Sequence, residues 1–234
     1  MTGPKRFYDK ALVEAVDSGF RLTLDGESIR TPGRAPVVLP TRPLADAMAA
    51  EWNAQGDTLD IRTMPVTRFA NAALDTAGEH RAALEATMAA YGETDLLCYR
   101  AGHPEGLVTA QAEGWDPLLD WAREALGAPL VTVEGIMAAE QPATSLARLR
   151  EAVAETDAFR LIALHELVSL SGSLVLGLAV AADRLSAEEA WTLSRIDEDW
   201  QVAQWGEDAE AAAAAERKRA DFLQAASIMA LASR

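Results

Sequence analysis

The stretch with the most chemical potential is SRIDEDWQVAQWGEDAE, from Ser194 to Glu210, which holds six carboxylates and two tryptophans. Such a cluster could supply a general acid and base, ligands for a metal ion, or a surface for another protein. General acid–base chemistry needs a carboxyl group in an apolar cleft, whereas Asp197, Glu198 and Asp199 are consecutive and point around a helix. A calcium loop of the D-x-D-x-D-G type does not occur in the sequence, so we predict no metal site.

A second candidate for chemistry is the pair Cys98 and His103, which could act as a thiol nucleophile and its base. This pair would make the protein a small cytoplasmic hydrolase, and that function stays open as the alternative. Close spacing is a weak signal, however, and the sequence favours Cys98 as a small buried apolar residue.

Other catalytic and cofactor motifs are missing from the sequence. His165 and Glu166 lack the second histidine of H-E-x-x-H, and there is no nucleophile elbow, P-loop or dinucleotide-binding glycine motif. We therefore predict that the protein is not an enzyme, with no catalytic residues and no cofactor.

Charge narrows the class of partner. The 234 residues carry a formal net charge of −15, of which residues 1–90 contribute −2 and residues 91–234 contribute −13. A surface this acidic does not suit nucleic acid or anionic lipid, because phosphate groups attract basic surfaces. The single cysteine, Cys98, excludes an internal disulfide and fits a reducing compartment.

No secretory signal or transit peptide is recognisable at the start of the sequence, so we expect a cytoplasmic protein. The longest apolar run, Leu161–Ala182, contains His165 and Glu166, and the part beyond them is shorter than the roughly 20 residues that cross a bilayer. We interpret the run as a central helix buried on most sides, whose Ser-Gly-Ser segment allows a neighbouring helix to approach closely.

The remaining sequence predicts the elements that would position these residues. Alternating apolar residues and the turns Asp25-Gly26 and Pro32-Gly33 predict a small antiparallel sheet within residues 19–40. A helix follows, with Thr41 as its candidate N-cap and Leu44, Met48 and Trp52 on one core stripe. A short strand is expected at Thr58–Ile61.

From Val66 onward the pattern is mainly helical, apart from a strand-like run at Leu130–Val133. The predicted fold class is α+β, with a small N-terminal α/β domain built on an antiparallel sheet and a C-terminal α-helical bundle. We place the N-terminal α+β domain at residues 1–90 and the helical domain at residues 91–234.

The acidic stretch itself lies on a predicted helix. Ser186 and Glu189 form a capping box, and Gly206 ends the helix. Helical spacing predicts a core stripe of Ala190, Leu193, Ile196, Trp200 and Ala203, with Trp200 buried. Trp191, Glu198 and Trp205 would share a different face. Trp205 would then either seal the junction with the next helix or contact a partner protein, since tryptophan is enriched at binding hot spots.

Eight segments in order along nearly the whole chain resemble a known family, the assembly chaperones that serve the catalytic head of ATP synthase. These segments are RFYDKA (6–11), LDGESIRTP (24–32), AAEWNAQG (49–56), TMPVTR (63–68), ETDLLCYRA (93–101), EGWDPLLDW (113–121), LSGSLVLGLA (170–179) and DEDWQVAQWGED (197–208). The resemblance implies a two-domain fold with a largely orthogonal helical bundle. It also implies a chaperone without catalytic activity that binds the free alpha subunit and prevents its aggregation before assembly with beta.

The resemblance also implies roles for individual residues. Partner-binding roles fall on four residues near the end of the acidic stretch: Trp205, Glu207, Asp208 and Glu210. Glu210 is the nearest match to the family's important glutamate, with Glu207 or Asp208 as alternatives. Structural roles fall on Trp52, Gln55, Pro65, Trp115, Gly172, Trp200 and Gly206. The expected partner is the unassembled alpha subunit, and the chaperone is expected to be a bacterial protein and a monomer when free.

Overall fold

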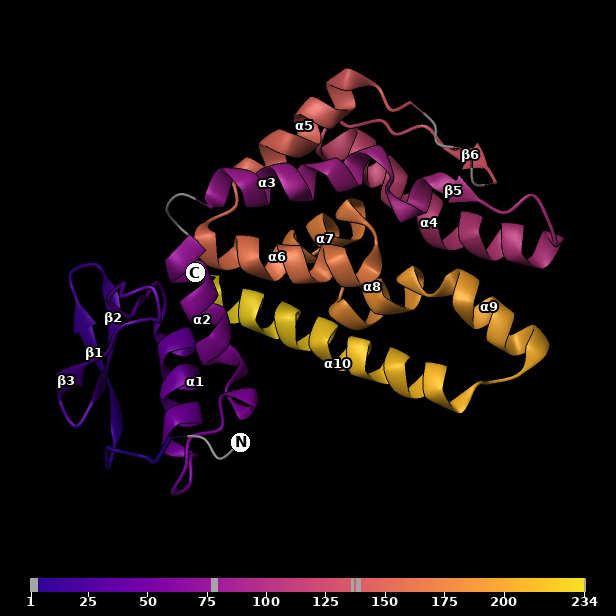
Figure 1. Ribbon diagram of the computed structural model, residues 1–234. Coiled ribbons are helices and arrows are strands. Elements are labelled where there is room, and N and C mark those ends of the chain that lie inside the picture. The colour runs from indigo at the N-terminus through magenta and orange to yellow at the C-terminus, as the bar shows by residue number, and fades with distance from the viewer. Residues whose placement is uncertain (1–3, 77–79, 136, 138–139, 234) are drawn as a thin grey trace. The chain divides into compact units, whose positions relative to one another are not determined.

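The computed structural model describes residues 4–76, 80–135, 137 and 140–233. Its strands are β1 (Ala11–Val16), β2 (Gly19–Leu24), β3 (Glu27–Ser28), β4 (Val38–Leu39), β5 (Tyr99–Arg100) and β6 (Val133–Glu134). Its α-helices are α1 (Arg42–Asn53), α2 (Pro65–Thr76), α3 (Arg81–Ala90), α4 (Glu105–Ala125), α5 (Ala143–Ala154), α6 (Ala158–Ser171), α7 (Leu174–Ala181), α8 (Ala187–Ser194), α9 (Ile196–Trp205) and α10 (Ala209–Ala232), as Figure 1 shows. This composition confirms the predicted α+β class.

The chain divides into two compact units. One comprises residues 1–81, 158–163 and 227–234, and the other comprises residues 82–157 and 164–226. The first contains the antiparallel sheet and the second contains most of the helices. The predicted domain boundary at residue 90 remains a prediction.

The sheet of the first unit is an antiparallel arrangement around β2, which pairs with β1, β3 and β4. The Asp25-Gly26 loop joins β2 to β3, and both of its residues have positive φ, +51° and +88°. Positive φ at both positions is the signature of the two-residue type I′ turn, so the predicted turn is confirmed. Leu22 and Leu24 are buried, and α1 packs against β1 and β2 (Figure 1).

Helix α1 begins at the cap that the sequence predicts, because the Thr41 hydroxyl accepts a hydrogen bond from the Leu44 N–H at 3.3 Å. Leu44 and Met48 are buried, but Trp52 is only half-buried, with its ring 5.5 Å from that of Tyr8. The strand expected at Thr58–Ile61 was wrong in extent. Only an isolated bridge between Lys5 and Thr58 forms, and a 3₁₀ turn begins at Ile61.

Polar side chains at the end of α1 form several hydrogen bonds with other elements of the first unit. The Glu51 carboxylate accepts hydrogen bonds from the Val66 and Thr67 N–H groups at 2.6 and 2.8 Å, so it satisfies free donors at the start of α2, where Pro65 is the first residue. The Asn53 side chain pairs with both backbone groups of Ala11. The side-chain amide oxygen of Gln55, Oε1, accepts a hydrogen bond from the Asp60 N–H at 2.8 Å. The side chains of Glu51, Asn53 and Gln55 therefore hold, in turn, the start of α2, strand β1 and the loop before Ile61.

The long apolar run, which lies in the second unit from residue 164 onward, is two helices rather than the single helix that we predicted. Gly172, at φ +73°, ends α6, and the Ser173 hydroxyl caps α7 by accepting from the Leu176 N–H at 3.0 Å. The close approach occurs instead at Gly177, where a Cβ atom would lie 2.6 Å from Cγ2 of Val168. Within the described residues, no helix combines the length and apolar character needed to cross a membrane.

A buried carboxylate links the turn before β5 to the start of α7. Asp95 is fully buried and accepts hydrogen bonds from the Ser173 hydroxyl at 2.7 Å and from the N–H groups of Leu97 and Val175 at 3.1 and 3.0 Å. Burial raises the pKa of Asp95, and these hydrogen bonds oppose that shift. The carboxylate thus sits at the start of α7, where the helix dipole favours an anion.

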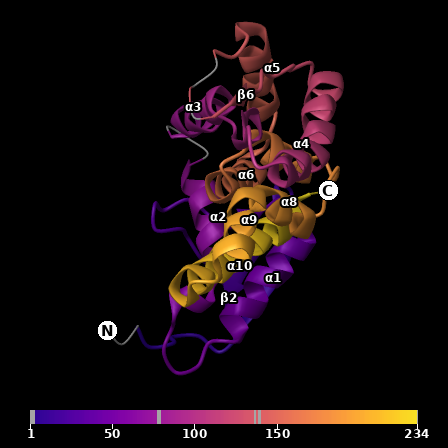
Figure 2. The ribbon, with the colours of Figure 1, turned by 90° about the vertical axis from the view of Figure 1, so that its right-hand side faces the viewer.

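Helix α9 is held against α4 through two glycines of α4. A Cβ atom at Gly106 would lie 2.5 Å from Cη2 of Trp200, and one at Gly114 would lie 2.8 Å from Cδ1 of Ile196. The indole N–H of the fully buried Trp115 donates to the Leu193 carbonyl at 2.8 Å. These contacts place α9 on the outside of the unit, next to α10 in both Figure 1 and Figure 2.

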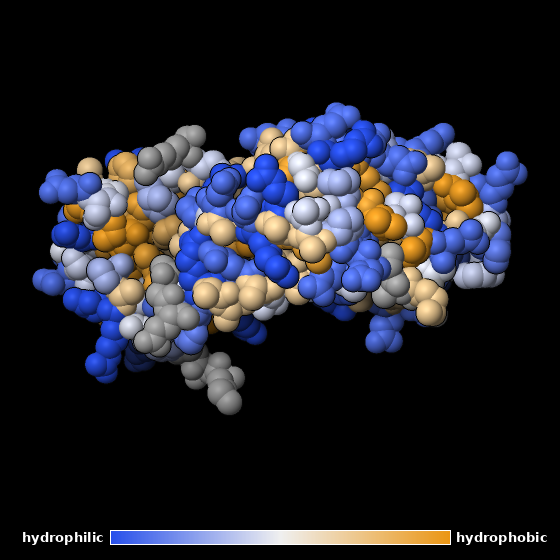
Figure 3. Space-filling model, turned by 90° about the horizontal axis from the view of Figure 1, so that it is seen from above, coloured by the Kyte–Doolittle hydropathy of each residue, from blue (hydrophilic) through white to orange (hydrophobic). Residues whose placement is uncertain are grey.

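The surface is hydrophilic over most of the face shown in Figure 3, with apolar side chains gathered in limited areas. Large exposed apolar side chains in the described part of the chain are Phe7, Leu12, Ile61, Val131, Met137, Val202 and Trp205. Trp205 has the highest exposed fraction of this group, 81%. Val202 and Trp205 lie one turn apart on α9, so they form a local apolar surface.

We predict that Asp95→Ala destabilises the protein by about 2 to 6 kcal/mol, because two buried N–H donors each lose a partner at about 1–3 kcal/mol. Urea denaturation followed by circular dichroism measures this change. Asp120→Ala is the matched control, since Asp120 forms an exposed ion pair with Arg123 at 2.7 Å and is expected to change stability by less than about 1 kcal/mol. Equal effects of the two substitutions would contradict the role of Asp95.

We predict that Trp52→Ala costs about 2 to 3 kcal/mol, less than the 3–5 kcal/mol typical of a fully buried tryptophan, because the side chain is half-buried. Thermal and urea unfolding of the variant measure the cost. Tyr8→Phe separates the ring contact from the hydrogen bond, since the Tyr8 hydroxyl donates to the Trp52 carbonyl at 2.6 Å. A Trp52→Ala variant with unchanged stability would show that this ring does not support the fold.

Candidate functional site

A groove with a volume of about 550 Å³ lies in the second unit, between the α8–α9 segment and the start of α10. Its lining residues are Trp191, Arg195, Glu198, Asp199, Gln201, Val202, Trp205, Gly206, Glu207, Asp208, Ala211, Ala212, Ala215 and Glu216. The groove therefore contains most of the acidic stretch that the sequence singles out. We call it the α9–α10 groove.

A break at Arg195 decides which side chains face this groove. The predicted single helix from Ser186 to Gly206 was wrong, because α8 ends at Ser194 and α9 begins at Ile196. The capping box of Ser186 and Glu189 that starts α8 is confirmed.

The structure changes the burial expected for the tryptophans. Trp191 is buried at 7% exposure and packs 5.6 Å from the ring of Phe222, but it lines the groove together with Glu198 and Trp205, as their predicted common face requires. Trp200, predicted to be buried, is only half-buried against α4, and Ala203 is exposed. No residue of α9 is buried. Helix α9 is thus a peripheral helix rather than a core helix.

Two residues of the turn from α9 to α10, Gly206 and Asp208, have different tasks. Gly206 has φ +91° and ψ 166°, a conformation open essentially to glycine alone, and it ends α9 as predicted. The Asp208 carboxylate accepts a hydrogen bond from the Ala211 N–H at 2.8 Å and so caps the start of α10. Asp208 therefore has a structural role as well as a place in the groove.

The groove is acidic, although several of its carboxylates are paired. Arg195 donates to Glu198 at 3.0 Å, and Arg219 bonds Glu216 at 3.2 Å and Glu188 at 2.7 Å. Glu207 is exposed and has no hydrogen bond or ion pair to any residue that the structure describes. Five carboxylates and one guanidinium line the groove, which suits a cationic partner.

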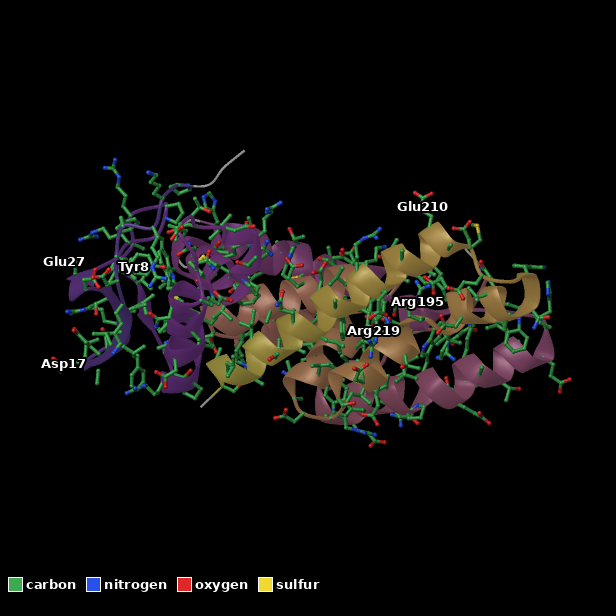
Figure 4. All side chains as sticks on the ribbon, turned by 90° about the horizontal axis from the view of Figure 1, so that it is seen from below. Tyr8, Asp17, Glu27, Arg195, Glu210 and Arg219 are labelled. Atoms are coloured by element: carbon green, nitrogen blue, oxygen red, sulfur yellow. The ribbon has the colours of Figure 1, made fainter. Side chains whose placement is uncertain are left out.

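The predicted partner-binding residues do not all meet in the groove. Trp205, Glu207 and Asp208 line it, whereas Glu210 does not. Figure 4 shows the Glu210 side chain pointing away from Arg195 and Arg219. Glu210 is exposed, lies in the first turn of α10 and has no partner among the described residues. It could contact a partner that extends beyond the groove.

Several groove residues were missed from the sequence. Val202 was passed over because the predicted core stripe assumed one continuous helix. Ala211, Ala212 and Ala215 were interpreted only as helix-favouring residues, although they form the α10 wall of the groove. The signal that could have found them is their spacing of three and four residues directly after Gly206, on the helix that folds back beside Trp205.

The other candidates for chemistry do not form a site. Cys98 is 1% exposed, and burial together with the charge of Asp95 raises the pKa of its thiol to about 12. A thiol with this pKa is almost entirely protonated near neutral pH, so it is a poor nucleophile. His103 is exposed. No group of three or more metal-ligating side chains that could hold an ion occurs among the described residues.

Comparisons with known proteins place the chain in a family. A family model described as "ATP12 chaperone protein" matches residues 5–123, just over half of the chain. The crystal structure of Atp12 from Paracoccus denitrificans superimposes with a TM-score of 0.94 at 44% identity, covering 98% of this chain and 99% of that one. A lysine-for-aspartate mutant of the same Paracoccus protein matches equally well, with a TM-score of 0.94 and 98% of each chain covered.

A curated relative adds support from a distant organism. The mitochondrial protein atp12 of Schizosaccharomyces pombe is 24% identical over 214 residues, which are 86% of this chain and 74% of the relative. The family match covers the sheet of the first unit, α1 to α3 and most of α4, and the structural match covers nearly the whole chain. The chain therefore belongs to the ATP12 chaperone protein family, the assembly chaperones of ATP synthase.

Proposed function

We propose that this protein acts in the cytoplasm by holding the unassembled alpha subunit of ATP synthase and preventing its aggregation until beta takes its place. The observation that carries the proposal is the exposed Trp205 at the edge of an acidic groove, in a chain of the ATP12 family. A tryptophan that is 81% exposed is costly to leave in water, and tryptophan is the residue type most enriched at binding hot spots.

The client's chemistry supports a holding role. A subunit made to sit in a ring exposes interfaces that resemble a bisected core until its neighbours arrive, and such surfaces aggregate. A holder needs an apolar contact for this surface and a strong net charge to keep the complex dispersed. The chain offers both, with Val202 and Trp205 beside the groove and a net charge of −15.

The same charge bears on the state of the free chaperone. A net charge of −15 opposes the close approach of two copies. We therefore propose that the protein is a monomer when free, which sedimentation analysis at moderate ionic strength can check.

The alternative of a cytoplasmic hydrolase that uses Cys98 and His103 has no comparable support. The thiol is buried and its pKa is raised, as described above. A buried thiol of this kind is typical of a core cysteine rather than of a nucleophile.

We predict that Glu207→Lys leaves folding unchanged but weakens protection of the alpha subunit. Glu207 is exposed and unpaired among the described residues, so its replacement removes no internal contact. Reversing a charge at a complementary interface is expected to weaken binding by about tenfold or more. The measurements are the melting temperature of the chaperone and its suppression of alpha-subunit aggregation by light scattering.

The controls separate the groove from general charge effects. Glu155→Lys makes the same charge change at an exposed position of the same unit that does not line the groove. Asp208→Lys is expected to weaken protection and also to lower stability by about 0.5–2 kcal/mol, since it removes a helix cap. Glu210→Lys tests whether the contact extends outside the groove. If the lysine variants at Glu207, Asp208 and Glu210 all protect the alpha subunit as well as the unmodified chaperone does, the proposed contact is wrong.

A further inference from the structure

The walls of the α9–α10 groove limit what kind of chain can occupy it. Apart from the turn at residues 206–208, both walls are helices, and the backbone N–H and C=O groups within a helix are already bonded to each other. The groove therefore offers an incoming chain very few backbone partners. An extended segment buried here would leave its own N–H and C=O groups unsatisfied, whereas a helix satisfies them internally.

The side chains of the groove suit the close approach of a helix. On the α10 side, Ala211, Ala212 and Ala215 project only methyl groups, so a neighbouring backbone can come near. On the α9 side, Val202 and Trp205 supply larger apolar surface, one turn apart and both exposed. An apolar strip between two helices is the setting in which an amphipathic helix lays down its apolar face.

The size of the groove indicates how deeply such a helix would enter. A helix of ten residues is about 10 Å across and about 15 Å long, so as a cylinder it occupies roughly 1,200 Å³, about twice the groove volume of about 550 Å³. The groove would thus hold the apolar side chains of one helix face, with the rest of the helix outside. Side chains at positions i, i+3 or i+4, and i+7 would meet the strip.

The charge of the groove determines which residues suit the flanks of the bound helix. Glu198, Asp199, Glu207, Asp208 and Glu216 line the groove, against the single guanidinium of Arg195. Arg195 already lies 3.0 Å from Glu198, so it is largely neutralised. Glu207 stands unpaired among the described residues at the end nearest Trp205. An occupant with lysine or arginine beside its apolar face is complementary to this rim, and an acidic occupant is repelled.

We propose that the α9–α10 groove binds an amphipathic helix of the client, with apolar residues at helical spacing and lysine or arginine on its flanks. The identity of the client rests on the function proposed above, but the chemistry of the bound segment does not. The inference names a structural class of segment that the chaperone selects, rather than a whole subunit surface.

A peptide experiment tests the inference on the full-length protein. The probe is a fluorescein-labelled peptide of about 14 residues, ~21 Å long when helical, with a leucine stripe at helical spacing and lysines on both flanks. We expect saturable binding by fluorescence anisotropy. A scrambled peptide of the same composition, the same peptide with two central prolines, and a version with glutamate in place of lysine are each expected to bind at least about tenfold more weakly.

Variants of the chaperone locate the binding. Ala212→Phe fills the groove and is expected to weaken binding of the helical peptide by about tenfold or more, comparable to the loss of a buried hot spot. Ala213→Phe is the matched control, because Ala213 is the next residue of α10, is exposed and does not line the groove. Trp205→Ala is expected to weaken binding to a similar degree as Ala212→Phe.

The outcomes separate this inference from the proposed function. Equal binding of the scrambled or proline-containing peptide would overturn the helical occupant, and so would equal binding to the Ala212→Phe and Ala213→Phe variants. The same two variants are then tested for protection of alpha subunit. If Ala212→Phe weakens protection of the alpha subunit but the helical peptide does not bind, only the inference of a helical occupant is wrong. If the helical peptide binds selectively but Ala212→Phe leaves protection of the alpha subunit unchanged, only the proposal that the client uses this groove is wrong.

Discussion

The close packing of α9 on α4 is the constraint on which the candidate site depends. Gly106 and Gly114 leave room for Trp200 and Ile196, and the N–H of Trp115 fixes the last turn of α8. Since α9 buries its contacts on this side, Val202 and Trp205 are left on the opposite side, beside α10. A larger residue at either glycine would push α9 away, so the exposed tryptophan is a consequence of packing elsewhere.

Local signals in the sequence were sufficient for much of the fold. The Asp25-Gly26 turn, the caps at Thr41 and Ser186 and the stop at Gly206 are each determined by neighbouring residues, and each was predicted. The predicted strand at residues 130–133 corresponds to β6, which begins at Val133 and pairs in parallel with β5. Pairing across more than thirty residues sets that register, so the sequence pattern alone places it only approximately.

The two errors in the helices share one physical cause, because helical periodicity was extended across breaks in the chain. Arg195 is an ordinary helix former, yet α8 ends before it and α9 begins after it; Trp191 is buried and Trp205 exposed, although both line the groove. Gly172 breaks the apolar run in the same way, where Asp95 collects the free donors of α7. Both breaks depend on residues distant in sequence. For the site, the sequence therefore indicated the acidic residues around Trp205 but not the groove or the alanines of its α10 wall.

The acidic stretch combines two uses of carboxylates that composition cannot separate. Asp208 and Glu189 cap helices, and Glu198 pairs with Arg195, so part of the negative charge stabilises the local fold. Other acids of the second unit rely on distant cations, as Glu188 does on Arg219 at 2.7 Å. Glu207 and Glu210 remain unpaired among the described residues, and they lie on either side of the cap at Asp208. Because the capping residue fixes the start of α10, it also fixes the directions in which its two acidic neighbours point. A chaperone that must release its client gains from this arrangement, since exposed charges add selectivity and association rate while contributing modestly to affinity.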